Sequence, residues 1–163
     1  MPRKNALIVA VIVVVAVIGT TLLVASFLNN GASQEIQKGE VSSLVTSFGK
    51  QLQKVSVLSP DASSTMATVY GAYASPQLLH DWQKNPATAP GRTTSSPWPD
   101  HIDITSINPQ GSGFIVNGNI VLMTSNETAH GGNAGLIPVV MLILNQNGKW
   151  QIVAYQEQRG NVH

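Results

Sequence analysis

The sequence predicts an α+β domain attached to an N-terminal transmembrane helix. Three observations lead to this prediction: residues 6–28 carry no charge, residues 34–84 have apolar positions at three- and four-residue steps, and residues 102–155 have apolar positions in alternation. These patterns are typical of a membrane span, of amphipathic helices and of strands, respectively. We therefore expect about three helices packed on a curved, four-stranded antiparallel sheet.

The apolar stretch from Ala6 to Leu28 matches the roughly 20 residues that a helix needs to cross a hydrocarbon core. Arg3 and Lys4 precede it, so the positive-inside rule places residues 1–5 in the cytoplasm. A cleaved signal peptide is the alternative, but the apolar run exceeds the roughly 7 to 15 residues of a signal-peptide core. Either way, residues 34–158 form a domain outside the cytoplasm, between a linker at 29–33 and a tail at 159–163.

Three helices are expected next. The first begins near Ser33 and runs for about five turns, with apolar residues recurring on one face up to Val55. A second helix starts at Ser63 or Ser64 as its cap. Pro76 suits the first position of a third, short helix, which Asn85-Pro86 ends.

A proline-rich connection without periodicity covers residues 85–100. Loops of this length within compact domains are often functional. Four strands follow, near residues 102–105, 114–125, 136–144 and 150–155. The Asn108 to Gly111 segment has turn chemistry, and Asn147-Gly148 predicts a tight hairpin.

Composition excludes several classes of function. The formal net charge is +1, and two of the nine basic residues precede the apolar stretch, which leaves seven against eight acidic ones. A domain near −1 lacks the basic surface that nucleic-acid binding needs. The chain has no cysteine, so disulfides, thiolate nucleophiles and cysteine metal sites are absent. We expect no cofactor and no metal site.

The loop motif Ala89-Pro90-Gly91-Arg92, followed by Thr94-Ser95-Ser96-Pro97-Trp98-Pro99-Asp100, resembles a group of uncharacterised membrane-anchored bacterial proteins. The resemblance covers roughly residues 40–157. The order of helices and strands is also similar to that of the nuclear-transport-factor-two-like (cystatin-like) superfamily. This resemblance implies a cone-like fold in which helices lie in the concave face of a bent sheet, and it implies no particular activity.

Seven residues are candidates for ligand or partner binding: Tyr73, Trp82, Arg92, Trp98, Asp100, His101 and Asp103. His101 and Asp103 share one face of a strand, where a histidine beside a carboxylate suits general-base catalysis. The plainer interpretation is that both face solvent, with Asp100 pairing with Arg92. Tyr73 and Trp82 either line a cavity or belong to the core, and Trp98 either contacts a partner or plugs the open end of the cone.

Three functions follow from these alternatives, and we assign no catalytic residue. The leading hypothesis is a membrane-anchored, non-enzymatic interaction or scaffold domain, with homodimerisation through the exposed face of the sheet. It predicts an apolar patch at Ile115, Val121 and Met123. The second is a small-molecule binder or a hydro-lyase or isomerase with its pocket inside the cone. The third is a subunit of a secretion or conjugation apparatus.

Overall fold

The computed structural model describes residues 31–158 of the chain. The expected membrane span at 6–28, the linker start and the tail at 159–163 lie outside these residues. The chain divides into two compact units, Met1–Gly39 and Glu40–His163. Of the first unit the structure describes residues 31–39, which are helical.

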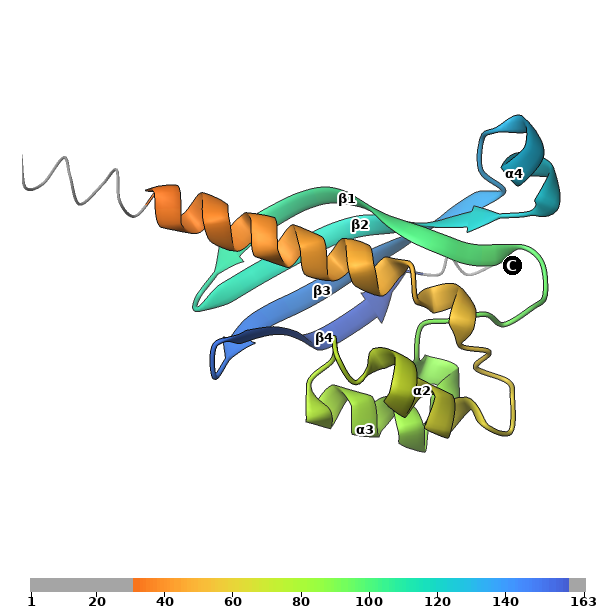
Figure 1. The fold of residues 1–163 in the computed structure, drawn as a ribbon, viewed down its shortest axis with the longest axis horizontal. Helices are drawn as coiled ribbons and strands as arrows, with labels where there is room; N and C mark the ends of the chain where they lie inside the picture. The colour runs from red at the N-terminus through yellow and green to blue at the C-terminus, as the bar shows by residue number, and fades with distance from the viewer. Residues whose placement is uncertain (1–30, 159–163) are drawn as a thin grey trace, which may run out of the picture. The chain divides into compact units, whose positions relative to one another are not determined.

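A four-stranded antiparallel sheet forms the framework (Figure 1). Its strands are β1 (Trp98–Gln110), β2 (Gly113–Met123), β3 (Gly135–Gln146) and β4 (Lys149–Glu157), and they lie side by side in chain order. Two register shifts interrupt the pairing of β1 with β2, and one interrupts that of β3 with β4. Such bulges bend a strand and increase its twist. The predicted antiparallel meander is confirmed.

Helices cover one face of this sheet. Helical residues 40–49 cross it and continue, after a turn, into the short 3-10 helix η1 (Leu52–Lys54). The helices α2 (Ala62–Tyr70) and α3 (Pro76–Lys84) lie on the β4 side. The segment between them joins the edge of β4, since Ile152 N donates to Tyr73 O at 2.9 Å and Ser75 N to Ile152 O at 2.9 Å. The fold is α+β, as predicted.

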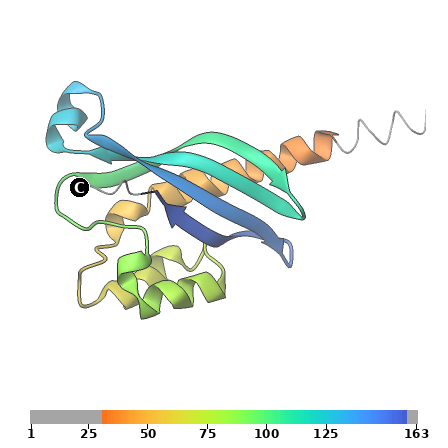
Figure 2. The ribbon, with the colours of Figure 1, turned by 180° about the vertical axis from the view of Figure 1, so that it is seen from behind.

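The core lies between these helices and the inner face of the sheet. On the helical side, apolar residues recur at the expected spacing, and all are 0% exposed: Val41, Val45, Phe48 and Leu52. On the sheet, alternate residues point inward and meet them, as a half-covered sheet requires: Ile102, Phe114, Val116, Ile120, Val139, Met141, Ile143 and Ile152. Figure 2 shows the other face of the sheet, which no helix in residues 40–158 crosses.

Several boundaries differ from the sequence prediction. The first helix ends at residue 49 rather than near Val55, because the next backbone hydrogen bonds, from Gln51 N to Phe48 O and from Lys54 N to Gln51 O, reach back three residues rather than four. The expected turn at Asn108 to Gly111 is shorter, since β1 runs to Gln110. Asn147 and Gly148 form the expected two-residue hairpin turn, with φ of 55° and 81°.

Two short helices were not predicted. One is η2 (Pro86–Thr88), in the proline-rich connection. The other, α4 (Ser125–His130), replaces part of the expected glycine-rich link. Its start is a capping box in which Thr124 and Glu127 exchange hydrogen bonds, a pattern that is visible in the sequence. The hydrogen bond from the Thr124 hydroxyl is the main reason why the pKa of Glu127 is lowered.

Candidate functional site

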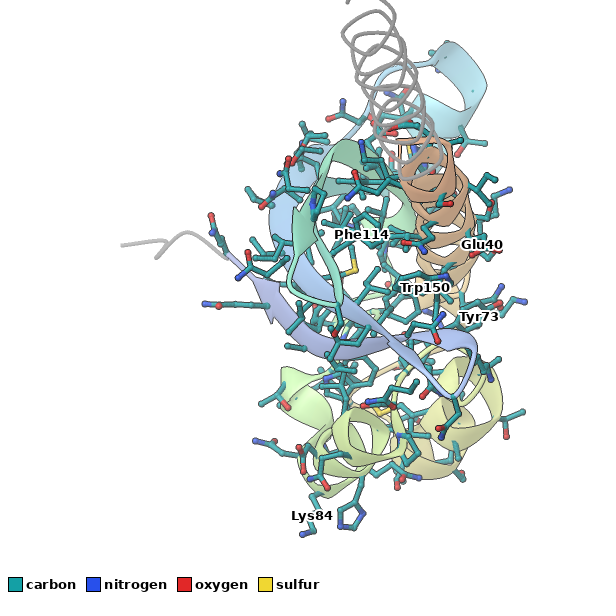
Figure 3. All side chains as sticks on the ribbon, turned by 90° about the vertical axis from the view of Figure 1, so that its left-hand side faces the viewer. Glu40, Tyr73, Lys84, Phe114 and Trp150 are labelled. Carbon is teal, nitrogen blue, oxygen red and sulfur yellow. The ribbon has the colours of Figure 1, made fainter. Side chains whose placement is uncertain are left out.

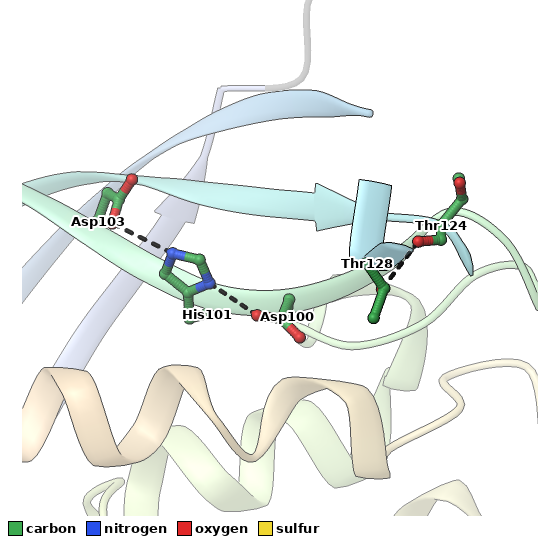
Figure 4. A network of polar contacts seen from close by, with 5 residues as sticks. All are labelled: Asp100, His101, Asp103, Thr124 and Thr128. Atoms are coloured by element: carbon green, nitrogen blue, oxygen red, sulfur yellow. Dashed lines mark hydrogen bonds and ion pairs between the residues drawn. The ribbon is translucent and has the colours of Figure 1, made fainter. Parts of the chain in front are cut away.

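His101 lies between two carboxylates (Figure 4). Its Nδ1 is 2.8 Å from Asp100 Oδ2, and its Nε2 is 3.2 Å from Asp103 Oδ1. The register shift between Pro99 and His101 lets Asp100 and His101, neighbours in sequence, meet on one side of the strand. The carboxylate of Asp100 therefore contacts His101 rather than Arg92.

This cluster faces away from the core. Ile102, between His101 and Asp103, is 4% exposed and belongs to the core. Side chains alternate along a strand, so the imidazole and the Asp103 carboxylate, 39% and 66% exposed, lie on the outer face of β1. Neither is among the residues that line the cavity beside the proline-rich loop, the hollow beside η2 or the depression on the outer face of the sheet. The arrangement orients an imidazole at the surface but encloses no substrate.

Tyr73 and Trp82 are part of an aromatic cluster inside the domain. Phe48 and Trp82 are stacked with ring centroids 6.3 Å apart, and Phe48 lies 5.9 Å from Tyr73 by the same measure. The rings of Tyr70 and Tyr155 complete the cluster in edge-on contacts. Such edge-to-face and offset contacts are preferred arrangements of packed rings. Packed aromatic rings therefore fill the space between the helices and the inner face of β4.

Tyr70 connects this cluster to the proline-rich connection. Its side chain is 0% exposed, and its hydroxyl donates to Pro90 O at 2.8 Å. Burial, and then the negative charge of Glu157, raise the pKa of the Tyr70 hydroxyl far above its usual range. Tyr70 is accordingly a neutral hydrogen-bond donor that fixes the position of the loop.

The loop is fixed a second time through Arg92. Its backbone N donates to Val55 O at 2.8 Å, and its carbonyl accepts from Val57 N at 3.0 Å. The Nε of Arg92 is buried and has no hydrogen-bond partner within residues 31–158. Trp98, in contrast, is half-buried at the start of β1. It belongs neither to the core cluster nor to the residues that line the cavity beside the loop.

A cavity of about 260 Å³ lies between this loop and the inner face of the sheet. The residues that line it are Gly91, Thr93, Thr94, Pro97, Pro99, Ile120, Leu122, Ile137 and Glu157. The loop was predicted to be functional from the sequence, but none of these lining residues was among the predicted site residues. Strand alternation was the available signal, because it places Ile120, Leu122 and Ile137 on the inner face.

The outer face of the sheet holds a second, shallower depression of about 300 Å³. Outward-pointing Ile115, Val140, Leu142 and Ala154 form its apolar surface. Of the predicted patch, Ile115 and Met123 are half-buried. Val121 is 5% exposed, because it lies between His101 of β1 and Leu136 of β3 in the register. The apolar patch exists, but its centre is on β3 rather than along β2.

Trp150 ties the helical layer to the sheet. Its indole Nε1 donates to Glu40 Oε2 at 2.8 Å, and its ring centroid is 5.5 Å from that of Phe114 (Figure 3). These contacts hold the start of β4 against the first turn of this unit.

No group of three or more histidine or acidic side chains within residues 31–158 is placed to hold a metal ion. Over the same range, no helix has both the length and the apolar character that membrane crossing needs. No family model, no curated protein and no solved structure matches the chain.

Proposed function

We propose that this chain is a membrane-tethered, extracytoplasmic interaction domain that works by protein contact rather than by catalysis. A second copy of the chain is the partner, and the outer face of the sheet is the contact surface. The observation that carries the proposal is that no helix within residues 40–158 covers this face and that its two central strands carry no charged residue.

The composition of the outer face suits contact between two identical copies of the chain. Neither β2 nor β3 contains an acidic or basic residue, although charged residues make up 10% of the chain. Two identical copies can therefore pack centre to centre without like-charge repulsion. The depression lined by Ile115, Val140, Leu142 and Ala154 supplies apolar area to bury.

Leu136, at the end of β3, extends the apolar surface. Its side chain is 51% exposed, and register places it beside Val121 on the same outer face. An isologous contact centred on β3 would bury the side chain of Leu136, which favours association because apolar area is removed from water.

The interior supports a role in contact rather than catalysis. A pocket enzyme of the cone-shaped type needs polar groups that converge on a substrate cavity. Here the aromatic rings of Phe48, Tyr70 and Trp82 fill the centre, and the His101 cluster lies on the opposite face of the sheet. The general-base hypothesis therefore lacks a substrate position.

The tether is the uncharged stretch from Ala6 to Leu28, with Arg3 and Lys4 on its cytoplasmic flank. We also propose that the domain is a cone-shaped member of the nuclear-transport-factor-two-like superfamily, in the membrane-anchored group that shares its proline-rich loop. The helices on one face of a bent four-stranded sheet support this assignment.

The absence of cysteine from the natural chain provides a direct test. In Ala154→Cys the single thiol lies in the outer-face depression. In the matched control Ala67→Cys it lies on the exposed side of α2. Full-length variants in native membranes are treated with a short bifunctional maleimide. We expect a crosslinked species of twice the chain mass for Ala154→Cys and none for Ala67→Cys.

Two results would refute the contact. One is that Ala154→Cys reacts completely with a monofunctional maleimide yet yields no crosslinked species. The other is equal crosslinking of both variants, which is the mark of random collision in the membrane.

A further inference from the structure

We propose that Arg92 and the polar groups beside it bind a phosphate group. The site lies where the proline-rich loop pairs with the segment that follows η1. Neither of these segments lines the depression on the outer face of the sheet, so the proposal is independent of the proposed self-association.

The guanidinium group of Arg92 has no counter-charge. Its Nε is buried and has no hydrogen-bond partner in the described part of the chain, and no carboxylate there forms an ion pair with it. The residue as a whole is only half-buried, which leaves its two Nη groups at the surface. An anion that binds these groups offsets the cost of holding a cation partly out of water.

Backbone pairing places Ser56 beside Arg92. Arg92 N donates to Val55 O at 2.8 Å, and Val57 N donates to Arg92 O at 3.0 Å, so Ser56 is the residue paired with Arg92. Directly paired residues project their side chains to one side, opposite to those of their chain neighbours. Val55 and Val57 belong to the core, whereas Ser56 is half-buried. The Ser56 hydroxyl is therefore a second donor on the outward side, next to Arg92.

The two segments that pair here carry only positive charge. Residues 50–60 and 85–99 contain no acidic residue and three basic ones, namely Lys50, Lys54 and Arg92. The described part of the chain, in contrast, has eight acidic and six basic residues. Both lysines are exposed, and Lys54 lies two residues before Ser56. A local excess of positive charge favours an anion over a cation or a neutral ligand.

The acidic residues that flank these segments in sequence have other partners. Asp61 accepts a hydrogen bond from the Ser59 hydroxyl, and Asp100 contacts the imidazole of His101. The positive charge of Arg92 is therefore not neutralised by either of them.

A phosphate group suits this set of donors. The planar guanidinium presents a fork of N–H groups to two phosphate oxygens, and the Ser56 hydroxyl supplies a donor for a third. A phosphate monoester or free phosphate carries more than one negative charge near neutral pH, so it gains more than a carboxylate does from Lys54. Free phosphate and the headgroup of an anionic phospholipid share this chemistry, and the test separates the two sources.

The test observes the Nε–H of Arg92 by NMR, in full-length protein in a non-ionic detergent that contains no phosphate. Arg92 is one of three arginines in the chain, and burial of its Nε slows exchange of this proton with water. Inorganic phosphate at constant ionic strength should shift this signal and the Val57 backbone amide signal, with a Kd of roughly 3 mM. Acetate, with a single charge, should bind about tenfold more weakly.

A second titration separates the two sources. Phosphatidylglycerol is added to the detergent micelles in the absence of free phosphate. A shift of the same two signals in this titration supports the site as one for lipid headgroups. A shift with inorganic phosphate alone supports it as one for free phosphate.

Arg92→Gln removes the charge of the guanidinium, and we expect it to bind phosphate about tenfold more weakly, as read at the Val57 amide. Lys54→Gln changes an exposed side chain and leaves the loop intact, and it should bind phosphate about threefold more weakly. The matched control Lys149→Gln removes an exposed lysine of β4, outside both segments, and should bind as the natural protein does. Unchanged backbone amide signals of β2 and β3 show that each variant is folded.

The proposal is overturned if neither inorganic phosphate nor phosphatidylglycerol moves the two signals at about 30 mM. It is equally overturned if acetate binds as tightly as phosphate, or if Arg92→Gln keeps the affinity of the natural protein. None of these results affects crosslinking through Ala154→Cys, so failure here and failure of the proposed function are separable.

Discussion

At the scale of single residues, the buried hydroxyl of Tyr70 is the contact that determines where the proline-rich loop lies. Its hydrogen bond to Pro90 O is enclosed, so water cannot replace it if it is lost. An unsatisfied buried polar group costs about 1 to 3 kcal/mol, which exceeds the value of most exposed hydrogen bonds.

Tyr70→Phe should therefore lower the free energy of unfolding by about 1 to 3 kcal/mol, because Pro90 O loses its donor. Tyr73→Phe is the matched control, since the Tyr73 ring contacts the same Phe48 and its hydroxyl has no hydrogen bond within residues 31–158. The measurement is urea denaturation of the full-length chain in detergent micelles, followed by tryptophan fluorescence. Equal loss from both substitutions would show that the Pro90 contact does not position the loop.

The residues of the surface cluster were easier to predict from the sequence than the residues that line the cavity. The closeness of Asp100, His101 and Asp103 in sequence made them candidates, and they do meet in space. Glu157, near the end of β4, was not among the predicted site residues. Its meeting with Gly91 and Thr93 depends on how the loop folds over the sheet, and no local pattern encodes that.

At the scale of elements, helical residues 40–49 pack so closely on β1 that position 49 has no room for a side chain. A Cβ added at Gly49 would lie 2.7 Å from Ile102 N, whereas one added at Gly39 would meet nothing within 4 Å. Both glycines are in helical conformation. Helix propensity alone favours alanine at both positions by about 1 kcal/mol.

The two positions should consequently respond in opposite directions. Gly49→Ala is expected to destabilise the domain by about 1 to 3 kcal/mol, because the added methyl group overlaps the backbone of β1. Gly39→Ala should stabilise the helix by about 0.5 to 1 kcal/mol. Urea denaturation of the full-length variants gives both values. A stabilising Gly49→Ala would mean that the helix does not pack on β1 as described.

Element types were predictable because their periods are strong, whereas their ends depended on tertiary contacts. Pro76 and Asn147-Gly148 mark α3 and the last hairpin correctly, since their backbone preferences are local. The helix was extended to Val55 because its apolar spacing continues there. In the structure the helix ends at residue 49, and the apolar spacing continues through a turn into η1. The cap of α4 was readable from Thr124 and Glu127 and was missed.

At the scale of the whole molecule, the α+β class and the order of the sheet followed from the sequence alone. The position of the apolar area on the outer face did not, because Leu142 of β3 and Ala154 of β4 meet only when the two strands are aligned. The proposed self-association assumes that the domain is held outside the cytoplasm.

That location is the central claim, and thiol labelling in intact cells tests it most directly. Ala67→Cys places the single thiol on the domain, and Asn5→Cys places it before the apolar stretch. The reagent is a maleimide that cannot cross the cytoplasmic membrane. We predict full labelling of Ala67→Cys in intact cells, and labelling of Asn5→Cys only after lysis. Protection of Ala67→Cys until the cells are lysed would contradict the account.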